Sequence, residues 1–192
     1  MNSETDEHIA RLADRISQSD RKAFDEFFRM LYPGLIRFAQ SYTHDKASAY
    51  DIVQDAFVNL WQHRKRVDGQ QSLRSYIYTS VKNLSLNEIR KNSALTFDSD
   101  LLDEQQHEKN TTPIQEGSRT DLSELFNEWI SQLPERQREA FELSRYDGLD
   151  HEEIAGVMNL SPKTVNNHIV LALKTLKDHY QLYKENRTSH DE

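Results

Sequence analysis

The chain has 192 residues, and its 32 acidic and 24 basic side chains give a formal charge of -8 at neutral pH. Five glycines and 36% hydrophobic residues favour a mostly helical protein over a turn-rich β protein. Because there is no cysteine, disulfides, thiolate zinc sites and cysteine nucleophiles are excluded. No apolar run approaches the roughly 18 residues of a membrane span, and the acidic, amphipathic start of the chain does not have the pattern of a secretory signal. We therefore expect a cytoplasmic protein with no direct membrane insertion.

The first part of the chain has the pattern of two amphipathic helices. Apolar residues with the i, i+3, i+4, i+7 spacing of one helical face are Ile9, Leu12, Ala13 and Ile16. Asp20 can cap a second helix over residues 21–42, in which Pro33 predicts a kink or a break just before it. The core candidates of this second helix are Phe24, Phe27, Phe28, Leu31, Leu35 and Phe38.

Two further helices complete the first predicted domain. One runs from about Ala47 to His63, and a polar loop over residues 64–72 follows it. Ser72 can cap the next helix, which is expected to end near Asn92. Together these segments predict one α-helical domain over residues 1–92.

Residues 93–121 have the composition of a linker. They carry seven acidic residues against two basic ones, show no sustained period and contain Pro113 and Gly117. Helical periodicity returns after Asp121, which has capping-box spacing to Glu124. We predict an all-α protein in which two small helical domains, 1–92 and 122–184, are joined by this flexible acidic linker and followed by a disordered tail at 185–192.

The stretch "LDHEEIAGVMNLSPKTVNNHIVLAL", residues 149–173, predicts two helices meeting at a tight turn. Asp150 and Glu153 have capping-box spacing, and Asn159 stands where the turn requires a positive φ. Ser161 can cap the second helix, with Pro162 at its first position. The apolar stripe of that helix is Val165, Ile169, Ala172 and Leu176. This pattern indicates a helix-turn-helix.

The second helix of this motif can enter a major groove, where asparagine pairs with adenine and lysine reaches guanine or phosphate. The residues that the apolar stripe leaves outside are Lys163, Thr164, Asn166, Asn167, Val170 and Lys174. The alternative is a helical hairpin that only packs.

A basic and aromatic block occupies residues 72–92. Its residues outside the buried face are Arg74, Tyr76, Lys82, Asn83, Asn87, Arg90 and Lys91. Cations that track phosphates, together with aromatic rings on which unpaired bases stack, form a platform for single strands. The alternative is a solvated helix with two packed tyrosines.

Just before this block, the helix around "YDIVQDAFVNLWQHR" has a polar ridge opposite its apolar stripe. The ridge consists of Asp51, Gln54, Asp55 and Asn59. It could dock a partner, but an ordinary solvated face has the same composition.

No catalytic or cofactor-binding pattern is found in the sequence. "HEEIA" resembles the start of a zinc-protease helix, but Ala155 stands where the second histidine would be. There is no nucleophile–base pair, phosphate loop or metal cluster, so we expect neither catalysis nor a metal or cofactor.

Taken together, these segments resemble the extracytoplasmic-function (ECF) group of sigma-70 family sigma factors, which give bacterial RNA polymerase its promoter specificity. The segments "SDRKAFDEFFRMLYPGLIRFA", "YDIVQDAFVNLWQHR" and "RSYIYTSVKNLSLNEIRKN" resemble the N-terminal sigma region 2. The segment "LPERQREAFELSRYDGLDHEEIAGVMNLSPKTVNNHIVLALKTLK" resembles sigma region 4. The sequence "TVNNH" at residues 164–168 is most similar to the iron-transport-regulator branch of this group.

The resemblance implies a role for each site. The ridge of Asp51, Gln54, Asp55 and Asn59 would dock on core RNA polymerase. The loop from Arg64, Lys65 and Arg66 to Ser72 would capture a base flipped from the −10 element, and the following helix would hold the melted non-template strand. Leu171 would join Lys163, Thr164, Asn166, Asn167, Val170 and Lys174 on the −35 duplex. An anti-sigma factor is implied as a further partner.

This assignment reconciles the overall negative charge with DNA binding, because a sigma factor need not bind DNA unaided. Three lysines lie between Pro162 and Lys177, and neutralising three phosphates gives a salt slope of only about -2.7. The family often has Trp in place of Tyr76, and Arg in place of Asn166, His168 and Leu171. The alternative function is a free-standing helix-turn-helix regulator of the response-regulator type, binding duplex DNA without polymerase.

Overall fold

The computed structural model describes residues 3–66, 72–97 and 122–188, and in these residues the protein is all-α, as predicted. The N-terminal half contains α1 (Ser3–Ser17), α2 (Arg21–Thr43), α3 (Lys46–His63), the 3-10 turn η1 (Arg64–Arg66) and α4 (Leu73–Phe97). The C-terminal half contains α5 (Leu122–Ser131), α6 (Glu135–Arg145), α7 (His151–Met158) and α8 (Pro162–Thr188). Within the described part, no helix is long and apolar enough to cross a membrane.

The predicted helix starts of the N-terminal half are formed by side-chain caps. Asp20 accepts hydrogen bonds from the backbone N–H groups of Lys22 and Ala23, which satisfies two of the free donors at the start of α2. The hydroxyl of Ser72 accepts from the N–H of Arg74 at 3.2 Å and so caps α4.

Helix α2 is continuous through Pro33, so the predicted break is not formed. A proline removes only one backbone donor, and the packing of both parts of α2 against α3 and α4 maintains the helix. Four of the six aromatic and leucine core candidates in α2 are buried, whereas Phe24 and Phe28 are only partly buried at the surface of the core.

Two helices are longer than predicted. Helix α4 runs to Phe97, five residues beyond the expected end at Asn92, and α8 runs to Thr188. Residues 185–188 are therefore helical, which corrects the start of the tail expected at 185–192. Residues 93–97 of the predicted linker are helical, and the rest of it, 98–121, including the cap at Asp121, lies outside the described residues.

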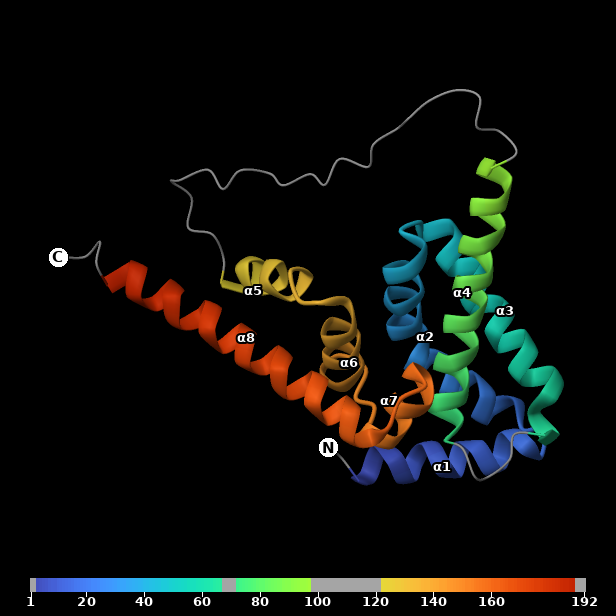
Figure 1. Cartoon of the computed structure of the whole chain (residues 1–192). Helices are drawn as coiled ribbons and strands as arrows, with labels where there is room; N and C mark the ends of the chain where they lie inside the picture. The colour runs from blue at the N-terminus through green and yellow to red at the C-terminus, as the bar shows by residue number, and fades with distance from the viewer. Residues whose placement is uncertain (1–2, 67–71, 98–121, 189–192) are drawn as a thin grey trace.

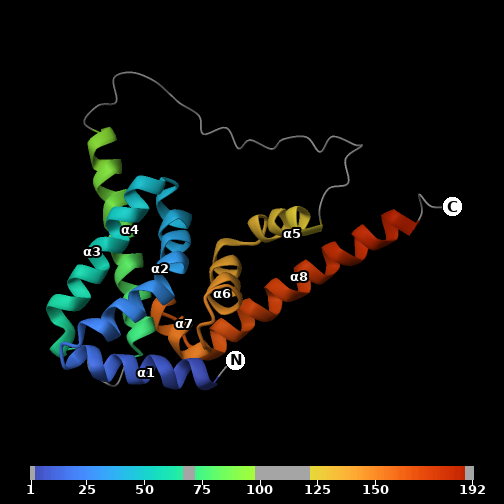
Figure 2. The ribbon, with the colours of Figure 1, turned by 180° about the vertical axis from the view of Figure 1, so that it is seen from behind.

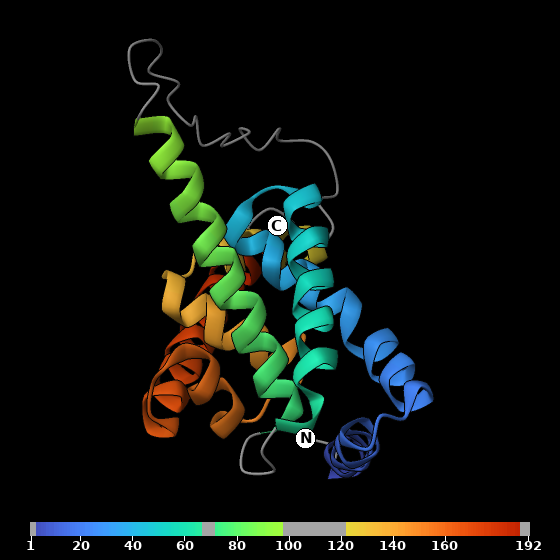
Figure 3. The same cartoon turned by 90° about the vertical axis from the view of Figure 1, so that its right-hand side faces the viewer.

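The two halves pack against each other through α4 and α7 (Figure 1). One continuous apolar core includes Tyr78 and Val81 of the N-terminal half and Leu143, Leu149 and Ile154 of the C-terminal half. Figure 3 shows α6 and α7 on one side of α4 and α3 on the other. Seen from behind, α8 extends away from this contact, with α5 alongside it (Figure 2).

Gly34 of α2 lies directly beside Asp147 of the C-terminal half. A Cβ atom on this residue would lie 2.7 Å from Asp147 Oδ1 and 2.8 Å from Tyr78 Oη. Because even an alanine would crowd both groups, the missing side chain allows the C-terminal half to approach α2.

Asp147 is the carboxylate beside Gly34, and its side chain is only 7% exposed. The guanidinium of Arg37 donates to it at 3.1 Å. Burial nevertheless raises the pKa of Asp147 from an ordinary 3.8 to about 6, while Arg37 and the Tyr78 hydroxyl act in the opposite direction. The packed structure therefore favours the protonated form of this carboxyl.

This raised pKa predicts how Asp147 contributes to the pH dependence of stability. Its contribution is fully present below about pH 4 and is lost as the pH rises through about 6, because the folded protein binds the proton more tightly. Between these values the wild type should lose up to about 3 kcal/mol of unfolding free energy relative to Asp147→Asn. Urea denaturation of both proteins from pH 4 to 7 measures this difference. Parallel stability curves would contradict it, and Asp25→Asn, at an exposed carboxylate, is the control.

Candidate nucleic-acid interface

The corner between α7 and α8 has the predicted helix-turn-helix geometry. Asp150 and Glu153 form a complete capping box at the start of α7. Asn159 ends this helix with φ 54° and ψ 51°, a left-handed conformation that asparagine tolerates better than most residues. The Ser161 hydroxyl then accepts from the N–H of Thr164 at 3.1 Å and caps α8.

The buried stripe of α8 determines which face of the helix contacts solvent. Val165, Ile169, Ala172 and Leu176 are all buried, as predicted. The exposed members of the candidate −35 set are Lys163, Asn166, Asn167, Val170, Leu171 and Lys174. Thr164 is half-buried and its hydroxyl pairs with that of Ser161 at 2.8 Å, so it belongs to the turn as well as to this face.

Two large apolar side chains stand in the middle of the exposed face. Val170 is 54% exposed and Leu171 is 48% exposed. Exposed apolar groups beside Asn166 and Asn167 suit a groove surface, where amides can pair with adenine and methyl groups can contact thymine.

The residues of α4 that are candidates for binding a single DNA strand fall into two groups according to their solvent exposure. In the C-terminal part of the predicted segment, Asn83, Asn87, Arg90 and Lys91 are exposed. In the N-terminal part, Arg74 is buried, whereas Tyr76 and Lys82 are half-buried. The structure therefore leaves the first group accessible and pairs Arg74 and Lys82 with carboxylates of the C-terminal half, while Tyr76 is half-buried against the core.

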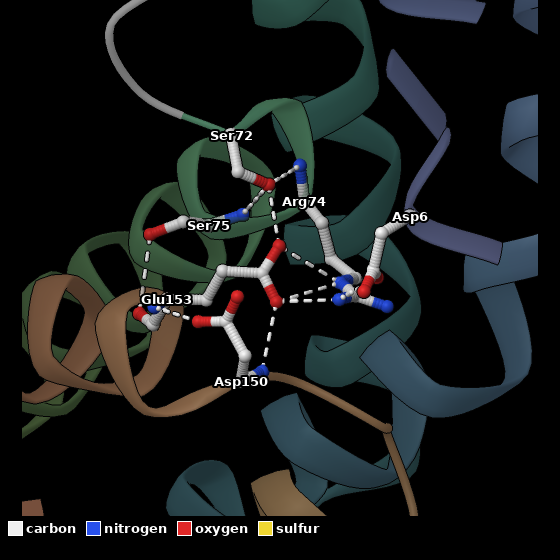
Figure 4. A network of polar contacts seen from close by, with 6 residues as sticks. All are labelled: Asp6, Ser72, Arg74, Ser75, Asp150 and Glu153. Atoms are coloured by element: carbon white, nitrogen blue, oxygen red, sulfur yellow. Dashed lines mark hydrogen bonds and ion pairs between the residues drawn. The ribbon is translucent and has the colours of Figure 1, made fainter. Parts of the chain in front are cut away.

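Arg74 is enclosed by carboxylates, as Figure 4 shows. Its side chain is 4% exposed, and its Nε donates to both carboxylate oxygens of Glu153 at 3.0 Å. Its Nη2 donates to Glu153 and, at 2.8 Å, to Asp6 of α1. Burial lowers the pKa of Arg74, but the hydrogen bonds and charge of Glu153, with those of Asp6, reverse this and raise it above its ordinary value. The guanidinium therefore stays charged.

Glu153 consequently has two structural roles. Its carboxylate accepts from the N–H of Asp150 at 3.0 Å, which completes the capping box, and from the Ser72 hydroxyl. The Ser75 hydroxyl donates to the Glu153 carbonyl oxygen at 3.2 Å. The capping box was predictable from local spacing, but the contact with α4, 79 residues earlier, was not.

Lys82 forms a further ion pair between the halves, in addition to Arg37–Asp147 and Arg74–Glu153. Its Nζ lies 2.6 Å from Glu139 Oε1 of α6, and the two side chains are 12% and 10% exposed. The Tyr42 hydroxyl donates to the same carboxylate oxygen at 2.7 Å. Burial, followed by the charge and hydrogen bond of Glu139, raises the pKa of Tyr42, so this hydroxyl remains a donor.

The candidate base-capture loop starts in η1 at the end of α3. The Arg64 guanidinium stacks 4.4 Å from the Trp61 ring and donates to the Trp61 carbonyl oxygen and the Ser19 hydroxyl. Arg64 thus fixes the start of the loop, while Lys65 is exposed. The side chain of Arg66 and all of residues 67–71 lie outside the described part.

The polar ridge on α3 is accessible. Asp51, Gln54 and Asp55 are exposed and Asn59 is half-buried. Beside the ridge is an apolar groove of about 400 Å³ between α2 and α3. Its lining residues are Phe24, Phe28, Gln54, Phe57, Val58, Trp61 and Gln62.

Sequence reasoning missed this groove, although one signal was present. Val58 lies among the polar positions of α3, and it is 52% exposed. An isolated valine at a polar position of an amphipathic helix is weak evidence alone. Here, however, Val58 lines the same groove as the partly buried Phe24 and Phe28. The ridge and the groove together form a mixed polar and apolar surface that suits protein docking.

Among the residues that the structure describes, no group of three or more histidine, aspartate or glutamate side chains could hold a metal ion.

Two sigma-70 family models match the chain in sequence order. Sigma-70 region 2 matches residues 27–95, which include α3 and its ridge, η1 and most of α4. Sigma-70 region 4 matches residues 123–176, which include the α7–α8 corner. The free-standing regulator is therefore not favoured.

Known proteins similar to the chain over most of its length are sigma factors. RNA polymerase sigma-H factor of Pseudomonas aeruginosa is 24% identical over 180 residues, covering 90% of this chain and 93% of that protein. ECF sigma factor SigM of Bacillus subtilis is 25% identical, covering 81% and 94%. ECF sigma factor RpoE of Cereibacter sphaeroides is 27% identical, covering 83% and 87%.

Two solved structures have a similar fold. CnrH, in complex with the cytosolic domain of CnrY, is 19% identical with a TM-score of 0.60, covering 91% of this chain and 98% of that one. Sigma factor RpoE of Bartonella quintana, in complex with the anti-sigma factor NepR, is 25% identical with a TM-score of 0.60, covering 83% and 98%. With regions 2 and 4 matched in order over more than half of its length, the chain belongs to the sigma-70 family and is an ECF-type RNA polymerase sigma factor.

Proposed function

We propose that this transcription initiation factor binds core RNA polymerase through α3 and contacts promoter DNA at two separate places. Helix α8 reads the −35 duplex, and α4 with the loop before it holds the melted non-template strand of the −10 element. The observation that carries the proposal is the exposed polar and apolar face of α8, which the helix-turn-helix corner fixes in place. The corresponding domain boundaries are 1–92 for region 2 and 122–184 for region 4.

The contribution of α8 is recognition of bases, because its DNA-facing side carries few charged residues. Asn166 and Asn167 are exposed in its second turn, where a recognition helix reaches base edges. Lys163 and Lys174 flank them and can reach phosphates, while Val170 and Leu171 offer apolar contacts. Because α8 carries few cations, its non-specific affinity for DNA phosphates is small. Promoter binding by this protein therefore depends on polymerase for most of its affinity.

The contribution of α4 is to hold single-stranded bases after the duplex opens. Arg90 and Lys91 can follow phosphates, and Asn83 and Asn87 offer hydrogen bonds on the same helix. Tyr76 supplies an aromatic ring, which can stack on any unpaired base. Opening is driven by this trapping, so the proposal requires no catalytic chemistry from the protein itself.

Two further features complete the proposal. The Bartonella quintana sigma factor was solved with an anti-sigma factor, and we propose an inhibitory partner of that kind here. Because the polymerase acts on chromosomal DNA, the cytoplasm is the proposed compartment. The iron-transport-regulator branch stays a prediction.

Base reading by α8 predicts the effect of removing its amides. Alanine at Asn166 or Asn167 should cost about 1–3 kcal/mol for each good base contact and relax the −35 preference, because the amide's pairing groups are lost. Transcription in vitro from promoters with intact and altered −35 sequences measures both effects. Asn186→Ala, an exposed asparagine at the other end of α8, is the control. Unchanged −35 discrimination in both variants would refute the assignment.

Docking through the α3 ridge predicts loss of the polymerase complex on charge reversal. Replacing Asp51 and Asp55 by lysine should abolish co-elution with core polymerase on a sizing column, while circular dichroism shows retained helicity. The control, Glu135→Lys with Asp178→Lys, changes the net charge equally at exposed sites elsewhere. Co-elution of the ridge variant at wild-type levels would show that the ridge is only solvated.

A further inference from the structure

Helix α4 is engaged twice: by the proposed DNA strand, and in this structure by carboxylates of the C-terminal half. We propose that the C-terminal half is an intramolecular inhibitor of strand binding, in which Glu153 and Glu139 occupy the positions of DNA phosphates at Arg74 and Lys82. The protein without polymerase is then closed, and the halves must separate before α4 can hold a strand. This inference rests on the proposed function of α4.

The contact at Arg74 has the chemistry of a phosphate site. A guanidinium binds carboxylate and phosphate through the same paired N–H groups, so the two anions compete for one position. Glu153 engages Nε and Nη2, and Asp6 takes a further hydrogen bond from Nη2. With 4% of the side chain exposed, Arg74 has no room for a phosphate while the halves are closed.

The contact at Lys82 is equally enclosed and its carboxylate is held in place. Glu139 accepts from Lys82 and from the Tyr42 hydroxyl, and its other oxygen lies 3.5 Å from Arg136. Three donors therefore orient one carboxylate against the strand-binding helix. A DNA phosphate could reach Lys82 only after α6 has moved away.

Closure blocks one DNA surface and leaves the other accessible. The α8 face is exposed in the closed structure, so −35 duplex contacts need no rearrangement. The exposed Arg90 and Lys91 can still attract a strand electrostatically, but Arg74 and Lys82 cannot join them. The inhibition is therefore specific for the melted strand.

The closed state can be opened by a ligand that binds only the open form. Buried ion pairs lose much of their Coulombic gain to the cost of removing both charges from water, so they add only modestly to the apolar contacts that also hold the halves together. A single strand that binds only the open form shifts the equilibrium by its preference for that form.

The test removes the two carboxylate charges while keeping their shapes. Glu139→Gln with Glu153→Gln should lower the closed-to-open ratio by about 100-fold, because buried Lys82 loses the charge of Glu139 and buried Arg74 keeps only that of Asp6. Glutamine at 153 can still serve the capping box, and glutamine at 139 can still accept from Tyr42. The matched control is Glu135→Gln with Glu152→Gln, at exposed positions on the same two helices.

Opening is measured by energy transfer between dyes on two introduced cysteines. The chain has no cysteine of its own, so Ala47→Cys at the start of α3 and Gln132→Cys between α5 and α6 are labelled uniquely. Both positions are exposed, and they lie near the place where the end of α2 meets the start of α6 in the closed structure. We expect high transfer in the wild type and in the control, and reduced transfer in the double variant. Equal transfer in all three proteins would overturn the proposal.

Strand binding is measured by the anisotropy of a fluorescein-labelled single strand of about 16 nucleotides and mixed sequence. The double variant should bind it at least about tenfold more tightly than the control, which has the same net charge. Opening without a gain in affinity over the control would also overturn the proposal, because Arg74 and Lys82 would then not be masked.

A second variant opens the halves without changing any charge. Gly34→Ala places a Cβ against Asp147 and Tyr78, and should reduce energy transfer in the same direction even if the double variant folds poorly. Core polymerase separates this inference from the proposed function. If energy transfer in the variants is unchanged while they open the promoter normally with polymerase, intramolecular inhibition is rejected and the proposed function stands. If the variants show reduced energy transfer but do not bind polymerase, the proposed function is rejected.

Discussion

A guanidinium stays charged when it is removed from water, so its burial is costly unless carboxylates lie beside it, and the position of Arg74 between Glu153 and Asp6 meets this constraint. Arg74 is in the first turn of α4, Asp6 is in α1 and Glu153 begins α7, so one buried cation ties three helices together. Glu153 also closes the capping box of α7, which begins the helix-turn-helix. The packing of the two halves and the start of the recognition motif therefore share a single carboxylate.

This sharing connects the fold to the function of a sigma factor. Two of the cations that would hold a melted strand, Arg74 and Lys82, also help to hold the closed structure together, whereas the exposed residues of α8 that would read duplex DNA take no part in these ion pairs. In the closed structure Glu153 and Glu139, two of the 32 acidic residues, are paired with these cations, and under our proposal a DNA strand competes with them.

Local patterns in the sequence predicted local structure well. The caps at Asp20, Ser72 and Ser161, the capping box at Asp150 and the left-handed Asn159 depend on neighbouring backbone groups, and all were formed as expected. The apolar stripe of α8 was also confirmed, because a period of 3.6 residues specifies its buried face without knowledge of its partner.

Contacts between the halves could not be predicted in this way. Arg74 and Glu153 are 79 residues apart, and Lys82 and Glu139 are 57 apart, and each has the spacing of an ordinary solvated charge. Gly34 gave no signal, since its role depends on Asp147 more than 100 residues later. The apolar groove beside the α3 ridge was missed for a related reason. Phe24 and Phe28 have core periodicity, and only the packing of α2 on α3 leaves them at its surface.

The most direct measurement is a cryo-electron microscopy structure of this protein with core RNA polymerase on a promoter that has a pre-melted −10 region. The account predicts that Arg74 and Lys82 contact phosphates or bases of the non-template strand, and that Glu153 and Glu139 have moved away with α6 and α7. An open complex in which both ion pairs remain intact, with the strand bound elsewhere, would contradict it.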